Sequence, residues 1–366
     1  MSRSRSPIIV KVGSALLVAP DGTVRTGWLA TLVAELAALA KGRPVGVVTS
    51  GAIALGARRL GLAKGGRASL EDAQAAAATG QIALAGVWSG LLAEHGLTAA
   101  QLLVTLDDFE DRRRYLNIAA TLERLFALGV VPVINENDTV ATEEIRFGDN
   151  DRLAARVAVA AGAAQVVLLS DVDGLHTADP SKDPRAERLQ VVPRVDARIR
   201  AMAGAGSGSG MGSGGMASKL AAADLATRAG VELVILSGLH DRPLARLADG
   251  AGTRFIADTR APSRKAWLAG RARARGVLTV DAGAAEALAK GASLLAAGVT
   301  GVEGSFARGE LVAVQGPDGT MLARGISEYD AAEVRAIAGA RRDALAERLG
   351  YAPRSAVIHR NHMVRA

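Results

Sequence analysis

Residues 130–171 have the sequence VVPVINENDTVATEEIRFGDNDRLAARVAVAAGAAQVVLLSD, and this stretch decides the fold class. Val130–Asn135 and Gln165–Ser170 are short, almost continuously apolar runs, which predicts strands that are covered on both faces. Between them, Asn150–Ala161 has the apolar pattern of a helix. A strand, a helix and a second strand in this order are typical of an α/β layered domain with a mostly parallel sheet.

The same alternation extends outward from this stretch in both directions. Further strands are predicted at Ile8–Val12, Pro44–Thr49, Gln101–Thr105 and Val231–Leu236. Further helices are predicted at Gly27–Ala40, Leu70–Glu94, Asp111–Leu128 and Ser218–Ala229. We therefore predict that residues 1–258 form one α/β domain.

The pattern changes after residue 258. Residues 259–276 contain arginine and lysine but no acidic side chain, and we expect them to be a basic linker. Residues 277–366 contain short apolar runs separated by turn signals such as Gly316-Pro-Asp-Gly319. The strands expected here are Gly276–Val280, Phe306–Gly309 and Leu311–Gln315. This last segment is predicted to be a small, mainly β domain.

Composition limits the chemistry. The 366 residues include no cysteine, which excludes disulfides, thiolate catalysis and cysteine-ligated metal sites. The formal net charge of +7 is unevenly distributed, because residues 1–258 carry +1 and residues 259–366 carry +6.

Apolar runs in the sequence stay well short of the roughly 18 uninterrupted residues of a membrane span. We expect a soluble, cytoplasmic protein with no membrane partner.

Polar residues follow the predicted strands at several places. These places are Lys11–Ser14, Thr49–Ala52, Asn135–Asp138, Phe147–Asp151 and Ser170–Gly174. Any one of them is an ordinary turn or cap sequence. Ligands of α/β sheets, however, bind beyond the carboxyl ends of the strands. Five polar sets in such positions predict a binding site at that edge of the sheet.

A glycine-rich segment, Gly204–Gly215, leads into Met216–Lys219 and a predicted helix. Backbone N–H groups at a helix N-terminus can bind phosphate oxygens, and a lysine adds positive charge. The standard P-loop pattern is absent, because serine and not glycine precedes Lys219. Two distant lysines, a glycine-rich loop and several carboxylates suit phosphoryl transfer to an acceptor that needs no deprotonation, such as a carboxylate.

Several motifs carry a resemblance to a known family. They are KVGS at Lys11, VVTSGAIALG at Val47, PVINENDTVA at Pro132, FGDND at Phe147, LLSDVDGLHTADP at Leu168 and GSGGMASK at Gly212. Together they closely resemble the amino-acid kinase superfamily and, within it, the branch that phosphorylates L-glutamate. The tail resembles a PUA domain in Leu278–Asp281, Gly304–Gly309 and Ala323–Ile326. The resemblance implies a three-layer αβα sandwich with a mostly parallel central sheet, plus a small mainly β PUA-like domain.

The same resemblance implies an activity and a set of site residues. The γ-phosphoryl group of ATP, with Mg²⁺, would pass to the side-chain carboxylate of L-glutamate in the first step of proline synthesis. Lys11 and Lys219 would neutralise the transferring group, and Asp151 would orient both lysines. Glutamate would be held by Ser50, Gly51, Asp138 and Asn150. The ATP site would comprise Lys11, Ser170, Asp171, Ser213, Gly214, Gly215, Met216, Ala217, Ser218 and Lys219.

Other possibilities stay open at this stage. A sister kinase could act on aspartate, N-acetylglutamate, a carbamate or UMP, although the INEND and FGDND motifs argue against these. RNA binding by the PUA-like domain is a possible secondary property, since the basic excess lies in the last third of the chain. By resemblance we also expect a homo-oligomer and inhibition by proline. The protein ligands of the metal are left unassigned.

Overall fold

A computed structural model describes residues 6–140, 150–203, 215–258, 274–354 and 356–365. The chain forms two compact units, unit 1 over Met1–Ala261 and unit 2 over Pro262–Ala366. Each unit has a sheet and a hydrophobic core of its own.

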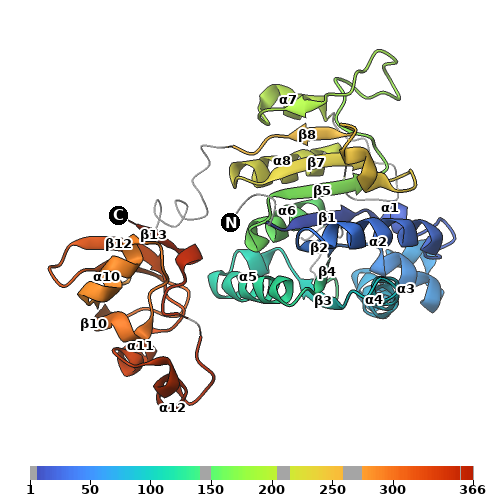
Figure 1. Ribbon diagram of the computed structural model, residues 1–366. Coiled ribbons are helices and arrows are strands. Elements are labelled where there is room, and N and C mark those ends of the chain that lie inside the picture. The colour runs from blue at the N-terminus through green and yellow to red at the C-terminus, as the bar shows by residue number, and fades with distance from the viewer. Residues whose placement is uncertain (1–5, 141–149, 204–214, 259–273, 355, 366) are drawn as a thin grey trace. The chain divides into compact units, whose positions relative to one another are not determined.

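Unit 1 is built on an eight-stranded sheet with the order β3-β4-β2-β1-β5-β7-β8-β6 (Figure 1). Neighbouring strands are parallel except β7 and β8, which run antiparallel. The strands are β1 (Ile8–Val12), β2 (Val45–Val48), β3 (Ala99–Val104), β4 (Val131–Glu136), β5 (Gln165–Ser170), β6 (Val191–Val192), β7 (Glu232–Ser237) and β8 (Thr253–Phe255).

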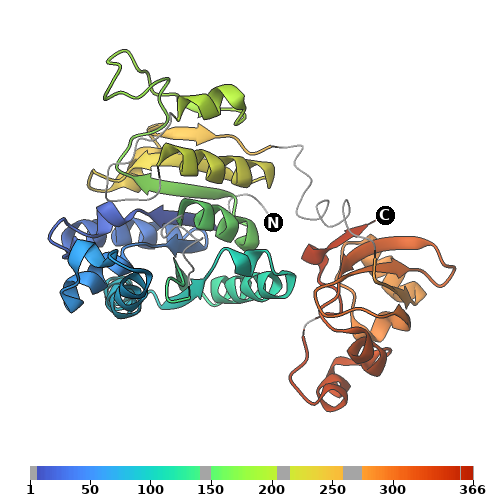
Figure 2. The ribbon, with the colours of Figure 1, turned by 180° about the vertical axis from the view of Figure 1, so that it is seen from behind.

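Helices cover both faces of this sheet, so unit 1 has three layers (Figures 1 and 2). One face carries α2 (Thr26–Ala40), α3 (Ala52–Leu60) and α4 (Leu70–Ala93). The other face carries α5 (Arg112–Ala127), α6 (Asn150–Ala161) and α8 (Met216–Arg228). The short elements are α1 (Ser14–Leu17), α7 (Ala197–Met202), η2 (Ala63–Gly66), η3 (Asp107–Phe109) and η4 (Pro243–Leu247). The predicted α/β class and mostly parallel sheet are confirmed.

Strand β1 shows how the sequence produces these layers. Ile8, Val10 and Val12 belong to the core on the α2–α4 face, and Ile9 belongs to the core on the α6–α8 face. Alternate side chains of a strand point to opposite faces, so Lys11 shares the face of Ile9 at the carboxyl end of the strand. The chain leaves β1 toward β2 on one side, and β5 pairs on its other side. Ligands of such sheets bind at this kind of switch point.

Helices α3 and α4 approach each other unusually closely, and two glycines make this possible. A Cβ atom on Gly80 of α4 would lie 1.8 Å from the carbonyl oxygen of Ala52, and one on Gly56 of α3 would lie 1.8 Å from that of Ala76. Helix α4 begins at an N-cap, because the Ser69 hydroxyl accepts a hydrogen bond from the backbone N–H of Asp72. The first turn of α3 is therefore held against a firmly anchored helix.

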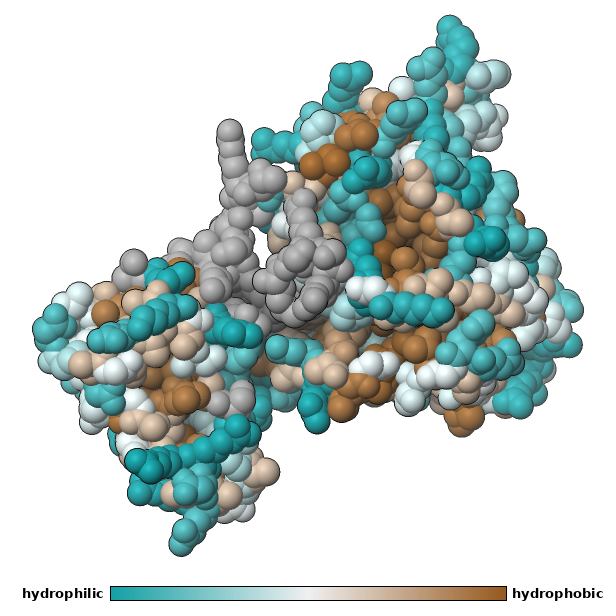
Figure 3. Space-filling model, viewed as in Figure 1, coloured by the Kyte–Doolittle hydropathy of each residue, from teal (hydrophilic) through white to brown (hydrophobic). Residues whose placement is uncertain are grey.

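Helix α4 also carries the most apolar long segment among the described residues. It is the one described helix long and apolar enough to cross a membrane. Its side chains Leu84, Trp88 and Leu92 are, however, buried in the core of unit 1, as in the core helix of a globular domain. On the face seen in Figure 3, hydrophilic residues are interspersed with hydrophobic ones.

Unit 2 has a five-stranded sheet with the order β10-β9-β11-β12-β13. Its strands are β9 (Gly276–Val280), β10 (Val299–Gly304), β11 (Leu311–Gln315), β12 (Met321–Ile326) and β13 (Met363–Arg365). Its helices are α10 (Ala282–Ala289), α11 (Ala331–Ile337), α12 (Leu345–Leu349), η5 (Ala296–Gly298), η6 (Arg342–Ala344) and η7 (Arg360–His362). The strand predicted at Phe306–Gly309 is wrong. This segment is a turn in which Phe306 is buried and Gly309 has a φ of 90°.

Candidate active site

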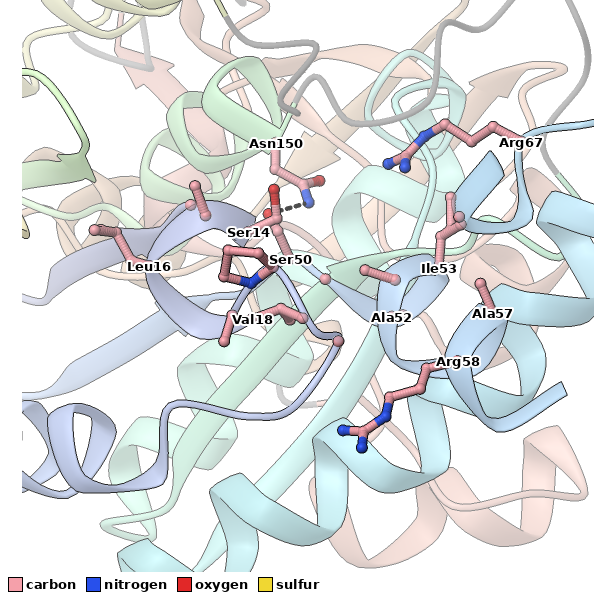
Figure 4. Close-up of a pocket in the computed structure, with 18 of the residues that line it drawn as sticks. Ser14, Leu16, Val18, Ser50, Ala52, Ile53, Ala57, Arg58, Arg67 and Asn150 are labelled. Carbon is pink, nitrogen blue, oxygen red and sulfur yellow. Dashed lines mark hydrogen bonds between the residues drawn. The ribbon is translucent and has the colours of Figure 1, made fainter. Parts of the chain in front are cut away.

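A cavity of about 620 Å³ opens at the carboxyl ends of β1, β2, β4 and β5. Each of these strands, or the two residues after it, supplies a polar side chain to the lining, namely Lys11, Ser50, Asn135 and Ser170. Figure 4 shows the Ser50 and Asn150 side chains meeting on one side of this cavity, while α3 and the turn after it form the other side. The polar residues quoted from the strand ends thus converge on one space.

A buried ion-pair centre lies at the deep end of the cavity. Lys11 Nζ is 2.7 Å from Asp151 Oδ1, and Lys219 Nζ is 3.1 Å from Asp151 Oδ2. The three side chains come from β1, α6 and α8 and are all buried. Burial alone would raise the pKa of Asp151, but the two ammonium groups hold that pKa below its ordinary value. Asp151 therefore stays ionised and fixes both lysines.

A chain of buried amides forms the next part of the wall. Asn150 Nδ2 donates to the Ser50 hydroxyl at 2.7 Å and to the Asn135 side-chain oxygen at 3.2 Å. Asn135 Nδ2 in turn donates to Gln81 Oε1 at 2.7 Å, from helix α4. The Asn150 Oδ1 atom is buried and accepts no hydrogen bond from the residues that the structure describes. A buried amide oxygen of this kind suits a ligand that brings a donor group.

Asp138 adds a negative charge to the same cavity. Its side chain lines the cavity and is buried, and this burial raises its pKa to about 6, although the charge of Arg67 acts in the opposite direction. A buried carboxylate without a close cation is costly to ionise. A cationic ligand group would relieve this cost, so Asp138 is suited to an ammonium.

Glycines let the backbone approach the cavity. Gly51, the N-cap residue of α3, has a φ of 100°, and a Cβ atom there would lie 2.9 Å from Val18 Cγ2. Gly215, the N-cap residue of α8, has no side chain to bind the first N–H groups of that helix. An uncapped N-terminus of a helix favours anions. Ser170 Oγ donates to Asp171 Oδ1 at 3.0 Å on the cavity wall.

The structure brings together most of the residues predicted from the sequence. The cavity lining includes Lys11, Ser50, Gly51, Asp138, Asn150, Ser170, Asp171 and Lys219. Asp151 contacts both lysines, while Gly215, Met216, Ala217 and Ser218 form the start of α8 without lining the cavity. Ser213 and Gly214 lie outside the described residues.

Sequence reasoning missed the support behind this wall. Gln81 is a buried polar residue in an apolar helix, and Trp88 of the same helix donates its indole N–H to the Thr49 hydroxyl at 3.0 Å. The signal was available, since Gln81 falls between Ala77 and Leu84 on the buried face of α4. A polar residue at such a position needs a hydrogen-bond partner.

Comparisons with known proteins identify the family of this chain. A profile of the amino acid kinase family matches residues 6–237, and one of the PUA domain matches residues 276–348. The chain is 64% identical to a protein from Sphingopyxis alaskensis named glutamate 5-kinase, over 98% of the chain and 96% of that relative. It is 63% identical to a glutamate 5-kinase from Novosphingobium aromaticivorans, over 98% of the chain and 95% of that relative.

A solved structure is also similar to part of this chain. The crystal structure of UMP kinase from Ureaplasma parvum is similar over 69% of this chain and 99% of its own, with a TM-score of 0.48 and 14% identity. The family resemblance drawn from the sequence motifs is confirmed by the profile matches and the two bacterial relatives. The chain belongs to the amino acid kinase family and carries a PUA domain after its kinase domain.

Proposed function

We propose that this protein transfers the γ-phosphoryl group of ATP to the side-chain carboxylate of L-glutamate. The product would be L-glutamyl 5-phosphate, in the first step of proline biosynthesis. The observation that carries the proposal is the buried Lys11–Asp151–Lys219 centre beside the carboxylate of Asp138 and the amide of Asn150. The two glutamate 5-kinases that match nearly the whole chain support this substrate.

The lysine centre suits phosphoryl transfer to a carboxylate. An oxygen of the glutamate side chain attacks the γ-phosphorus, the bond to the β-phosphate oxygen breaks, and ADP leaves. The acceptor is already ionised at neutral pH, so no general base is required. Lys11 and Lys219 neutralise the charge on the transferring group. Asp151 is a positioning residue and not a base, because its pKa is lowered by the two lysines.

The polar wall suits an α-amino acid. The α-ammonium group would pair with the Asp138 carboxylate and donate to the Asn150 Oδ1 atom, which accepts no hydrogen bond from the described residues. Ser50 and the backbone at Gly51 would complete the glutamate site. The Gln81–Asn135 pair would keep the Asn150 amide in the orientation that presents its oxygen.

Nucleotide would bind on the other side of the lysine centre. The described parts of this proposed ATP site are Ser170 and Asp171 on the cavity wall and the uncapped start of α8 after Gly215. Among the described residues, no group of three or more carboxylate or histidine side chains converges to hold a metal. We therefore propose that Mg²⁺ enters as the phosphate-bound ion of ATP, and we assign no residue to it.

The substrate proposal is tested by measuring ADP release with glutamate, aspartate and N-acetylglutamate in parallel. Glutamate should be the best substrate by about a hundredfold in kcat/KM, a ratio that one methylene group or one lost ionic contact can produce. N-acetylglutamate lacks the ammonium group that Asp138 favours, and aspartate is too short to span the same contacts. Faster ADP release with either competitor, or with UMP, would contradict the proposal and favour a sister kinase.

Asp138 should make glutamate binding pH-dependent. Its raised pKa of about 6 means that the carboxyl is protonated below that pH and loses the charge that attracts an ammonium. We expect the KM for glutamate to rise about tenfold between pH 7 and pH 5 while kcat changes little, because the substrate's own carboxylates stay mostly ionised over this range. Asp138→Asn should raise KM at neutral pH to about its value at pH 5 and remove the titration. A KM that stays flat from pH 5 to pH 8 in the unmodified protein would refute this role.

Proline and self-association belong to the same proposal. Proline carries a cationic nitrogen next to a carboxylate, so we propose that it competes with glutamate near Asp138.

The exposed side chains Ile82 on α4 and Leu103 on the edge strand β3 support a homo-oligomer. RNA binding gains no electrostatic support from residues 277–366, the predicted PUA-like domain, because they carry 10 basic and 10 acidic side chains. The basic excess of the last third lies entirely in residues 259–276.

A further inference from the structure

Three further cations line the cavity besides Lys11 and Lys219. Arg58 is in the last turn of α3, and Lys64 and Arg67 are in the turn that joins α3 to α4. Their side chains are exposed at the mouth of the cavity, unlike the buried Lys11 and Lys219. The proposed mechanism gives no role to any of these three.

The turn that carries Arg67 is held firmly in place. Gly65 and Gly66 have φ angles of 61° and 76°, so the chain reverses sharply just before Arg67. A Cβ atom on Gly66 would lie 2.9 Å from the Cβ of Ala57 and 3.1 Å from the Cβ of Ala76, which shows that the turn packs against both α3 and α4. Ser69 then caps α4. Arg67 is thus fixed at the mouth of the cavity by packing on both sides.

Arg67 differs from the neighbouring arginine in what it faces. The charge of Arg58 acts on Asp21, and its side chain packs beside the turn at Gly22. The charge of Arg67 acts on Asp138 across the cavity. Figure 4 shows its side chain extending from the turn into the side of the cavity where Asn150 lies. Within the described part of the chain, the Arg67 backbone N–H donates to the Lys64 carbonyl, but its side chain forms neither an ion pair nor a hydrogen bond, so its guanidinium is available to a ligand.

An α-amino acid carries an ammonium and a carboxylate on the same carbon atom. A site that recognises both needs a carboxylate and a cation on one cavity, and Asp138 and Arg67 both line this one. Glutamate has a second carboxylate, but that one must reach Lys11 and Lys219 to be phosphorylated. A cation away from the two lysines therefore suits the α-carboxylate, and a guanidinium binds a carboxylate through two parallel hydrogen bonds.

We propose that Arg67 binds the α-carboxylate of the amino-acid substrate and so selects substrates with a free carboxylate at that position. The inference rests on the proposed glutamate kinase activity and adds a specificity-determining residue to it. Arg67 makes no contact with the reacting atoms in this arrangement, so its loss should act on substrate affinity and leave the transfer step in place.

The experiment compares L-glutamate with its α-amide, isoglutamine, which keeps the γ-carboxylate and the ammonium group. The unmodified protein should prefer glutamate by about ten- to hundredfold in kcat/KM, because one charge-assisted hydrogen bond changes binding by about this factor. Arg67→Met should raise the KM for glutamate by a similar factor, leave the KM for ATP unchanged and remove most of the preference. Arg67→Lys should restore part of it, because a lysine keeps the charge and loses the paired geometry.

Two matched variants make the result specific. Arg59→Met changes an exposed arginine of the same helix end that does not line the cavity, and it should leave the preference intact. Lys64→Met changes the neighbouring cation of the same turn, and loss of the preference there instead would assign the carboxylate to Lys64. A preference unchanged in Arg67→Met, or a raised KM for ATP alone, overturns the inference. No turnover of glutamate by the unmodified protein refutes the proposed function itself, which is a separate outcome.

Discussion

Replacing Lys219 by methionine is expected to lower kcat for glutamate phosphorylation by about a thousandfold, as removal of a preorganised charge from a buried reaction centre does. Lys219 Nζ lies 3.1 Å from Asp151 Oδ2 in a buried centre, so its charge is only weakly screened by water. Methionine keeps the unbranched shape of the side chain and removes the charge. Lys11→Met should have an effect of the same order, because Lys11 supplies the other cation of the centre.

The loss of turnover must be separated from a loss of fold. Either lysine variant leaves Asp151 paired with the remaining lysine, so we expect a cooperative thermal transition to persist. Binding of ATP measured by calorimetry, together with circular dichroism, verifies that the site is still formed. Arg59→Ala on the exposed end of α3 is the matched charge-removal control and should retain full turnover. Near-normal kcat in a folded Lys219→Met or Lys11→Met variant would contradict the assigned roles.

Replacing Gly80 by alanine is expected to destabilise unit 1 by about 3 kcal/mol or more, the upper range for overpacking in a dense interior. The added Cβ atom would lie 1.8 Å from the carbonyl oxygen of Ala52 and 2.6 Å from the backbone nitrogen of Gly56. Both are backbone atoms, so no side-chain rotation can relieve the contact. Helix α3 must move away from α4, and Ser50 and Gly51 precede α3 directly.

The melting temperature should therefore fall by roughly 10 °C, and the KM for glutamate should rise in the protein that remains folded. Gly86→Ala is the matched control, because a Cβ atom there meets nothing within 4 Å on the same helix. Alanine at that exposed helical position should leave stability unchanged or raise it by about 0.5–1 kcal/mol. Equal melting temperatures for the two variants would show that the α3–α4 contact does not constrain the fold.

Much of unit 1 could be predicted from local sequence pattern. Helix Asn150–Ala161 and strand Gln165–Ser170 have the predicted bounds, because each carries an uninterrupted apolar pattern between clear turn signals. Strand β8 was missed, since three residues give no periodicity. Phe306–Gly309 was predicted as a strand because it is apolar at its start, but Phe306 is buried from a turn. In that segment the packing of one aromatic ring outweighs the local pattern.

Part of the candidate site could also be predicted from local sequence, and part could not. Lysine, aspartate and asparagine at strand ends were recognised because parallel strands bring their carboxyl ends to one edge. Asp151 pairs with Lys11, which lies 140 positions earlier, and with Lys219, which lies 68 positions later. Both pairs depend on how three elements pack, and no local sequence pattern indicates them. The amide chain from Gln81 to Asn150 reaches across two helices and a strand, and Arg67 lines the same cavity as Asp138 only once the turn is folded. These are properties of the packed structure.

The central claim is that the lysine centre transfers a phosphoryl group to the side-chain carboxylate of glutamate. Trapping the product with hydroxylamine tests it most directly, because an acyl phosphate is converted to a hydroxamate while other phosphorylated products are not. With glutamate, ATP and Mg²⁺, we predict that γ-glutamyl hydroxamate forms in equal amount to ADP, and that Lys219→Met abolishes both together. Release of ADP without hydroxamate, or hydroxamate formation that persists in Lys219→Met, would contradict the claim.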